Sequence, residues 1–346
     1  MAFVENQTSK KSLSRWESDL FKFILDWISG THFISIKTSG STGDSKWMKV
    51  EKEKMVKSAQ LTGDFFNLQK NDKALLCLPV EFIAGKMMVV RAFVLELNLI
   101  PVEPSGNPLK DLNKAFDFAA MTPMQVHAVL NFNDGFQKLN KIRNLIIGGG
   151  EVNQLLFDQI KNLENNTYHT YGMTETLTHV ALLKMNGRDS DDCYKALPGV
   201  KFEKDNRDCL VISAAHLAPN KIITNDIVNL KAENKFEYIG RFDNIINSGG
   251  IKMSPEKVEQ VLSGYIPGRF IIAGIPDEKL GQKVVLIVEG VKNSQTGFSG
   301  IINSVVKEKY ERPKEIFYLN SFPETENGKI KRRKTLEMIL PLTDNN

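Results

Sequence analysis

The chain has 346 residues, of which 42% are hydrophobic and 25% are charged, and its formal net charge is +4. This composition is that of a globular protein, and the length is typical of two domains. The weak positive charge does not indicate a nucleic-acid-binding protein, and no apolar run reaches the ~18 residues of a membrane-spanning helix. The first residues lack the apolar core of a signal peptide, and the three cysteines have no paired spacing. We therefore expect a cytoplasmic protein with free thiols and no membrane insertion.

Helices and strands alternate through the first two-thirds of the chain. Apolar positions from Leu20 to Ile28 recur at helical spacing, and Thr122-Pro123 has the form of a helix N-cap and first turn. Further helices are predicted over 85–95, 124–130 and 152–163, and strands over 33–36, 74–78, 99–102, 145–147 and 167–171. This alternation predicts an α/β sheet, whose ligands usually lie at loops beyond the strand ends.

A second, smaller unit begins near Gly240. Ser254-Pro255-Glu256 predicts a helix start, with a capping hydroxyl and proline at the first position, and Val258, Val261 and Leu262 form its expected buried stripe. Strands are predicted over 270–273, 284–288 and 316–319, and a helix over 301–306. We expect a compact α+β domain of about a hundred residues. The predicted division is therefore 1–240 and 244–346, with the hinge near Asp243.

A run of small and hydroxylated residues follows the strand predicted over 33–36. It consists of Thr38, Ser39, Gly40, Ser41, Thr42 and Gly43, with Lys46 shortly after. Small side chains let backbone N–H groups approach an anion closely, while hydroxyls and a lysine add donors and positive charge. The run is not a Walker loop, because that pattern needs four residues between its glycines and then Gly-Lys-Ser/Thr. A surface turn is the alternative, but the composition favours a phosphate-binding loop for a nucleoside triphosphate.

Four further segments combine residue types that suit a bound nucleotide. They are Gly148–Glu151, Tyr171–Thr176, Thr224-Asn225-Asp226 followed by Gly240-Arg241 and Ser248-Gly249-Gly250, and Glu326–Lys334. An aromatic ring can stack on a base, hydroxyls can bind phosphate, and a carboxylate can hold Mg²⁺. An acidic side chain at a strand end suits the paired hydroxyls of a ribose. Asn327-Gly328 predicts a turn that presents Lys329.

Together, and in this order, the five segments resemble the adenylate-forming enzymes: acyl- and aryl-CoA ligases, luciferases and nonribosomal peptide adenylation domains. The resemblance extends from about residue 34 to 340. It implies an α/β fold with a large N-terminal domain and a small mobile C-terminal α+β domain. Because only 37 residues precede the phosphate loop, we expect the large domain to be a shortened version of the family's.

The resemblance also implies a role for each matching residue. Thr38–Gly43 and Lys46 would hold the leaving pyrophosphate, and Gly149, Gly150 and Tyr171 would line the adenine slot. Thr174 would contact the α-phosphate, Glu175 would bind Mg²⁺, and Asp226 and Arg241 would hold the ribose. Asp243 would be the hinge, Gly249 and Gly250 would line the pantetheine path, and Lys329 would be the catalytic lysine of adenylation.

Two positions depart from the family pattern. Ser45 precedes Lys46 where proline is usual, and Asn225 stands where glycine is common. Neither change removes one of the side chains named above. The implied reaction therefore remains complete: an acid and Mg·ATP form acyl-AMP and pyrophosphate, and coenzyme A then displaces AMP after the small domain swings.

Short members of the family resemble the o-succinylbenzoate–CoA ligases of menaquinone biosynthesis. The segment from Leu78-Pro79 through Gly85 to Arg91 carries this resemblance, which places Gly85 and Arg91 at the acid. A buried Arg91 would pair with a second carboxylate, and a plain fatty acid would leave its charge unpaired. The alternative is that Arg91 is an ordinary surface residue. His179, which follows Glu175 closely, would border the pocket, although a lone histidine is more often structural; the other four histidines have no metal-ligand spacing.

Several alternatives remain open at this point. Another aryl- or acyl-CoA ligase, or an adenylation enzyme that loads a carrier protein, would carry the same motifs. A non-catalytic nucleotide-binding protein belongs to a different class, and the intact Lys329, Glu175 and Asp226 argue against it. The basic run Lys331–Lys334 fits a solvated helix face better than a nucleic-acid site. The expected partners are a small carboxylic acid, ATP and coenzyme A, and a homodimer is compatible with the sequence.

Overall fold

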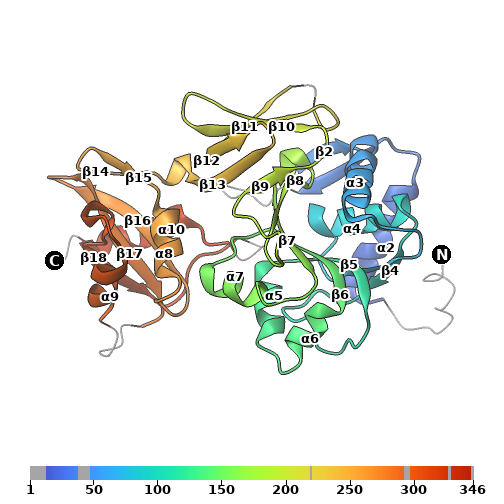
Figure 1. Ribbon diagram of the computed structural model, residues 1–346, viewed down its shortest axis with the longest axis horizontal. Helices are drawn as coiled ribbons and strands as arrows, with labels where there is room; N and C mark the ends of the chain where they lie inside the picture. The colour runs from blue at the N-terminus through green and yellow to red at the C-terminus, as the bar shows by residue number, and fades with distance from the viewer. Residues whose placement is uncertain (1–12, 38–46, 219, 292–296, 326–328, 344–346) are drawn as a thin grey trace.

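The computed structural model describes residues 13–37, 47–218, 220–291, 297–325 and 329–343 (Figure 1). Within these ranges the strands form a two-stranded hairpin, an eleven-stranded sheet and a five-stranded sheet. The hairpin joins β1 (Phe33–Lys37) to β2 (Trp47–Glu51) in antiparallel register. The predicted α/β fold class, with a smaller α+β part after it, is confirmed.

One half of the large sheet is parallel. Its strands are β3 (Lys73–Leu76), β4 (Asn98–Pro101), β5 (Phe116–Met121), β6 (Ile142–Ile147) and β7 (Asn166–Gly172), in the spatial order β4-β3-β5-β6-β7. Parallel neighbours need crossover connections, and helices fill these connections here. This arrangement brings the ends of β6 and β7 to the same edge of the sheet.

Helices cover both faces of the parallel half. They are α2 (Arg15–Ile28), α3 (Lys52–Phe66), α4 (Ile83–Val94), α5 (Pro123–Leu130), α6 (Gly135–Asn140) and α7 (Gln154–Ile160). Alternate residues of β3 enter different cores: Leu76 packs in the cluster with α3 and α4, and Leu75 packs in the cluster with α5 and α7. The period of two along a strand explains why both faces of β3 are apolar.

The other half of the large sheet is antiparallel. Its strands are β8 (His179–Lys184), β9 (Tyr194–Ala196), β10 (Val200–Lys204), β11 (Cys209–Ala214), β12 (Ile222–Ala232) and β13 (Lys235–Arg241). None of these six strands is predicted from the sequence pattern, because several are short and their alternation is weak. Phe202 and Phe236 anchor this half in the larger core, where both are buried.

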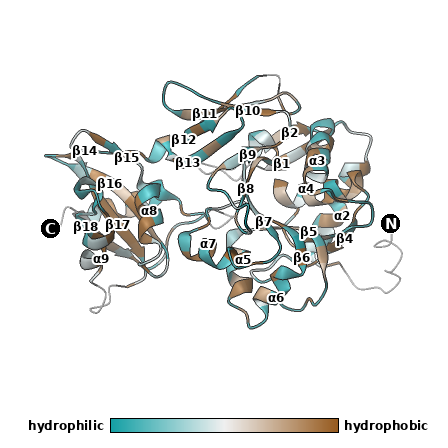
Figure 2. Cartoon of the chain, viewed as in Figure 1, coloured by the Kyte–Doolittle hydropathy of each residue, from teal (hydrophilic) through white to brown (hydrophobic). Residues whose placement is uncertain are grey.

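The small sheet follows the connection η2 (Phe242–Asn244). It contains β14 (Ile246–Ser248), β15 (Ile251–Met253), β16 (Phe270–Asp277), β17 (Gly281–Glu289) and β18 (Glu315–Leu319), and its helices are α8 (Pro255–Leu262), α9 (Phe298–Val305) and α10 (Arg332–Thr343). Figure 2 shows the apolar character of β16 and β17, which separate two further cores. Figure 1 shows this unit to the left of the large sheet.

Two details of α8 differ from expectation. Val261 is 45% exposed, so the buried stripe consists of Val258 and Leu262, which are four residues apart and share a face. The hydroxyl of Ser254 does not cap the helix. It donates instead to Glu256 Oε2 at 2.7 Å and, across the junction, to the carbonyl of Ile239 at 3.2 Å.

The two sheet units also touch through α7 and α8. The backbone N–H of Gln154 donates to Ser263 Oγ at 3.3 Å.

Among the helices that the structure describes, none is long and apolar enough to cross a membrane.

The predicted N-cap at Thr122 is confirmed. Its hydroxyl accepts from the N–H of Gln125 at 3.2 Å, and Gln125 Oε1 accepts from the N–H of Thr122 at 3.0 Å.

We expect Thr122→Ala to lower the free energy of unfolding by about 1 kcal/mol, because the cap oxygen is lost. Urea unfolding followed by circular dichroism measures this change. Thr122→Ser retains the oxygen and should stay near wild type, so equal losses in both variants would contradict the capping role.

Candidate functional site

The candidate site lies where β6 and β7 end and where the small unit approaches them. After β6, Gly149 has φ of +81°, a conformation that favours glycine. A Cβ at Gly148 would lie 2.3 Å from Thr170 Oγ1, so the loop passes directly against β7. These glycines therefore have structural reasons to be glycine. The adenine slot proposed at Gly149 and Gly150 stays a prediction.

His169 fastens this glycine loop to the antiparallel strands. Its Nε2 lies 3.0 Å from the carbonyl of Gly150, which only accepts, so Nε2 carries the proton. Nδ1 then accepts from the hydroxyl of Tyr194 at 2.6 Å. Burial lowers the pKa of His169, which keeps the ring neutral in this arrangement. No sequence motif indicates a site role for His169, although it lies two residues before Tyr171 on the same face of β7.

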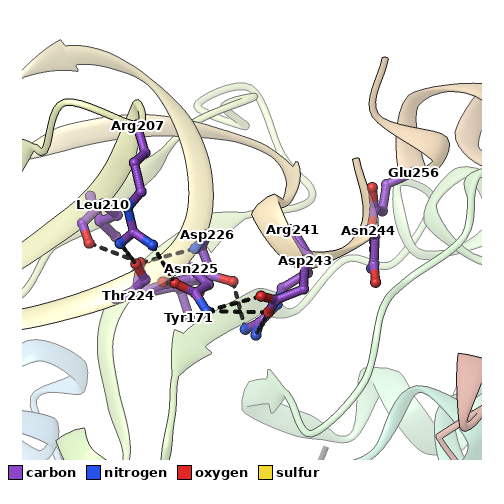
Figure 3. A network of polar contacts seen from close by, with 10 residues as sticks. All are labelled: Tyr171, Arg207, Leu210, Thr224, Asn225, Asp226, Arg241, Asp243, Asn244 and Glu256. Atoms are coloured by element: carbon purple, nitrogen blue, oxygen red, sulfur yellow. Dashed lines mark hydrogen bonds and ion pairs between the residues drawn. The ribbon is translucent and has the colours of Figure 1, made fainter. Parts of the chain in front are cut away.

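Asp226 is the centre of a buried polar network (Figure 3). Asp226 is 5% exposed. Tyr171 Oη donates to Oδ2 at 2.5 Å, and Arg241 Nη1 donates to Oδ1 at 3.0 Å. The N–H of Asp226 donates to Thr224 Oγ1 at 3.0 Å. The structure thus brings together three predicted nucleotide residues from β7, β12 and β13.

Tyr171 is held on two sides by aromatic rings. Its centroid lies 5.7 Å from that of Tyr194 and 5.0 Å from that of Phe236, both edge to face. Burial and the Asp226 carboxylate raise the pKa of Tyr171, so the phenol remains a hydrogen-bond donor. Stacking of this ring on adenine stays a prediction.

Thr174 and Glu175 lie on the single turn η1 (Thr174–Thr176) directly after β7. The turn is fixed by Thr176, whose Oγ1 donates to the carbonyl of Thr178 at 2.7 Å and accepts from the N–H of Met173 at 2.9 Å. Glu175 is exposed, whereas Thr176 is fully buried. The fold therefore presents the Glu175 carboxylate to solvent at the strand end.

A magnesium ion would fit Glu175 only together with other oxygens. The described residues contain no group of three or more His, Cys, Asp or Glu side chains that could hold a metal. Mg²⁺ is commonly bound by one or two carboxylates together with substrate phosphates and water. A single exposed carboxylate matches the protein part of that donor set, so Glu175 is compatible with the predicted role.

Lys329 approaches the network from the small unit. Its N–H donates to Thr325 Oγ1 at 3.1 Å, and its carbonyl accepts from the N–H of Thr325 at 2.8 Å. Desolvation and the positive charge of Arg241 lower the pKa of Lys329, while Asp226 opposes this shift. Lys329 thus lies close enough to Arg241 and Asp226 for their charges to act on it, and its role in adenylation stays a prediction.

Gly249 and Gly250 form the two-residue turn between β14 and β15. Both have positive φ, at +61° and +81°, as a turn of this hairpin type needs. Figure 1 shows this hairpin in the part of the small unit remote from β7. The loop predicted for the pantetheine path and Lys329 are therefore not at the network together in this arrangement.

Thr38–Gly43 and Lys46, the predicted phosphate loop, lie outside the described residues. Their flanks are placed, because Lys37 at the end of β1 pairs with Trp47 at the start of β2. The hairpin register thus brings the two ends of the segment together. The phosphate-binding role of the segment stays a prediction.

Arg91 is buried on α4, so the alternative that it is a surface helix residue is wrong. It is 2% exposed, its Nη1 lies 3.7 Å from Met88 Sδ, and its guanidinium carbon lies 5.8 Å from the centre of the Phe118 ring. Its Nε has no hydrogen-bond partner among the described residues. Burial lowers the pKa of Arg91 to about 10, which leaves the guanidinium charged at neutral pH.

His179 lies on β8, next to the end of β7, and is near enough to Arg91 for the guanidinium charge to act on it. It is 6% exposed, and its Nε2 also has no partner in the described part of the chain. Burial and the Arg91 charge lower the pKa of His179 to about 3, so the ring is neutral. His179 pairs with Gly172 in the sheet, two residues before Thr174. His179, one of the two residues with an unpartnered polar atom, thus lies next to the turn that carries Thr174 and Glu175.

Gly85 has a packing role on α4. A Cβ at this position would lie 2.2 Å from the carbonyl oxygen of Pro79, so only glycine lets the helix approach the loop before it. This contact explains the residue without a ligand. Its predicted position at the acid stays a prediction.

The chain is similar to known AMP-binding enzymes in both sequence and structure. The family model of the AMP-binding enzymes matches residues 33–207, and the chain therefore belongs to this family. The chain is 36% identical to an acyl-CoA synthetase (AMP-forming)/AMP-acid ligase II-like protein from Dyadobacter fermentans, covering 96% of this chain and 97% of that one, with a TM-score of 0.64. The resemblance inferred from the motifs is thus confirmed.

Longer relatives carry a more specific name. The chain is 24% identical to the 2-succinylbenzoate–CoA ligase of Listeria monocytogenes, covering 87% of this chain and 68% of that enzyme. It shares its fold with the o-succinylbenzoate coenzyme A synthetase (MenE) of Bacillus subtilis, which was solved with ATP and magnesium, at 18% identity and a TM-score of 0.74. The coverage agrees with the expected shortening relative to such enzymes.

Removal of the Tyr171 hydroxyl tests the buried network. We expect Tyr171→Phe to lower the free energy of unfolding by about 1–3 kcal/mol, because a buried carboxylate oxygen loses its donor. Tyr168→Phe is the matched control on β7, since the Tyr168 hydroxyl has no hydrogen bond among the described residues. Equal unfolding free energies for the two variants would show that the contact to Asp226 contributes nothing.

Proposed function

We propose that the protein is an ATP-dependent, AMP-forming acid–CoA ligase that converts 2-succinylbenzoate to 2-succinylbenzoyl-CoA through an acyl-adenylate. The family and the approach of Lys329 to Asp226 and Arg241 support the ligase class. The observation that carries the choice of acid is Arg91, a buried cation whose Nε is unpartnered among the described residues. The names of the relatives agree with this acid.

A buried guanidinium strongly favours an acid with a second carboxylate. Leaving such a charge unpaired is costly, whereas a carboxylate would supply both charge and hydrogen-bond acceptors. Neutral His179 adds a further polar group to the same place, because its Nε2 is also free among the described residues. 2-Succinylbenzoate has two carboxylates, so one can face Arg91 while the other reaches the turn with Thr174.

The first half-reaction would join the acid carboxylate to the α-phosphorus of ATP and release pyrophosphate. Negative charge grows on the phosphate oxygens, and Lys329 would stabilise it from the small unit. Asp226 and Arg241 would hold the ribose, and Thr174 would contact the α-phosphate. Glu175 would hold Mg²⁺, which when bound neutralises phosphate charge. Coenzyme A would then displace AMP once the small unit had turned at Asp243 to bring in Gly249 and Gly250.

An acid panel tests the function directly. Pyrophosphate release should be measured with ATP, Mg²⁺ and coenzyme A for 2-succinylbenzoate, benzoate, phenylacetate and a fatty acid. We expect a strong response to 2-succinylbenzoate alone. The monocarboxylate 4-oxo-4-phenylbutanoate is the matched control, because it keeps the side chain and lacks the ring carboxylate. An equal response to this compound would contradict the pairing of Arg91 with the ring carboxylate of the acid.

Lys329→Ala should separate the two half-reactions. We expect acyl-AMP formation to fall by at least about 10²-fold, since a charge that acts in the transition state is lost. Thioester formation from supplied acyl-AMP should remain largely intact, because Lys329 leaves in the second step. Single-turnover assays of each step measure both rates. Equal loss of both rates would contradict the role of Lys329.

Arg91→Ala should raise the KM for 2-succinylbenzoate by about 10²-fold or more and leave the KM for ATP nearly unchanged. Steady-state kinetics with each substrate varied in turn measure both constants. Met88→Leu is the matched control, because it alters the neighbour of the guanidinium at nearly constant volume. An unchanged KM for the acid in the Arg91→Ala variant would show that Arg91 does not contact the acid.

A further inference from the structure

Asn225 bridges a cation and an anion at the connection between the two sheets (Figure 3). Its Oδ1 accepts from Arg207 Nη1 at 2.9 Å. Its Nδ2 lies 3.1 Å from Asp243 Oδ1 and 3.3 Å from Oδ2, so it donates to the carboxylate. Both neighbours fix the orientation of the amide, because the guanidinium only donates and the carboxylate only accepts.

An amide is the side chain that suits this position. A carboxylate there would accept from Arg207 but repel Asp243, and glycine would contact neither. Glycine is common at this position in the family that the chain resembles, so the contact depends on a residue in which this chain departs from the pattern. Asn225 is only half-buried, yet it connects β12 to η2 through two charged groups.

Arg207 is itself firmly held. Its Nε donates to Asp205 Oδ2 at 2.8 Å, and its Nη2 donates to the carbonyl of Thr224 at 3.0 Å. Its guanidinium carbon lies 5.2 Å from the centre of the Phe242 ring. Arg207 therefore contacts the first residue of η2 directly and the second, Asp243, through Asn225. We call Arg207, Asn225, Phe242 and Asp243 the clasp.

The clasp lies beside the residues that meet Lys329. Arg241 Nη2 donates to Asp243 Oδ2 at 2.8 Å, while its Nη1 donates to Asp226. Asp243 is thus held by Arg241 on β13 and by Asn225 on β12. In this arrangement of the small unit, the charges of Arg241 and Asp226 act on Lys329.

We propose that Asn225, anchored by Arg207, is a positioning residue that holds Asp243 and thereby favours the arrangement in which Lys329 meets Asp226 and Arg241. The inference rests on the proposed function, since it assigns the held arrangement to acyl-AMP formation. A rotation of the small unit at Asp243 would break the hydrogen bonds from Asn225 to Asp243 or require Asn225 to move with Asp243. The clasp consequently speeds acyl-AMP formation and slows thioester formation.

Kinetics of the two half-reactions test this assignment. Asn225→Gly should slow acyl-AMP formation and speed thioester formation from supplied acyl-AMP, each by about 3- to 10-fold, as expected for the net contribution of a typical hydrogen bond at a half-exposed site. Asn229→Gly is the matched control, because Asn229 lies on the same strand and donates to Glu237 rather than to η2. A purely structural role would lower stability in both variants without opposite rate changes, and that result would overturn the proposal.

A swap of donor and acceptor provides a rescue. Asn225→Asp alone should shift the two rates further than Asn225→Gly, because two carboxylates then face each other. The double substitution Asn225→Asp with Asp243→Asn restores one donor and one acceptor, and should return the ratio of the two rates toward wild type. Failure of the double variant to improve on Asn225→Asp would contradict a direct contact between the two side chains.

A distance measurement tests the clasp without any acid. Spin labels at Lys201→Cys on β10 and Lys279→Cys beside β17 report the separation of the two sheets, and the three native cysteines are buried. Dipolar spectroscopy should give a narrower distance distribution for the parent than for Asn225→Gly or Arg207→Gln, with Asn229→Gly unchanged. Identical distributions in all variants would overturn the clasp. A protein that activates no acid but shows the broadening would contradict the proposed function alone.

Discussion

The buried carboxylate of Asp226 is the constraint on which the site depends. An acidic group that is 5% exposed needs donors on both oxygens, and Tyr171 and Arg241 supply them from β7 and β13. This requirement ties the end of the parallel half of the sheet to the end of the antiparallel half. It also sets the direction of Arg241, whose second nitrogen holds Asp243 at the start of the small unit.

Two further polar groups at the site are left incompletely satisfied by the described residues. Arg91 and His179 are buried among apolar side chains, and their free nitrogens have no packing purpose. Stability alone would favour apolar residues at such positions, because removing charge from water costs several kcal/mol. The acidic ligand of the proposed function would account for that cost, and the pairing of His179 with Gly172 places His179 near η1. In the proposed function, Asp226 and Arg91 would thus organise the nucleotide and acid sides of one site.

The parallel half of the fold was predictable, and the antiparallel half was not. Strands such as 145–147 are continuous apolar runs bounded by glycine or helix signals, and these signals are local. Strands β8 to β13 are recognised only by what they pair with: β9 has three residues, and its Tyr194 matters because it packs on Tyr171 and bonds to His169. The exposure of Val261 has a similar origin, since the face of α8 that is buried depends on where β16 lies.

The sequence by itself determined the family, the order of the motifs and the chemical types at the site, because each motif is a short run whose residues act through local backbone geometry. Tertiary structure decided the rest. It buried Arg91 against Phe118, made His169 the link between Gly150 and Tyr194, and placed Asn225 between Arg207 and Asp243. Burial, tautomer and the partner of a hydrogen bond depend on residues distant in the chain, and no local pattern encodes them.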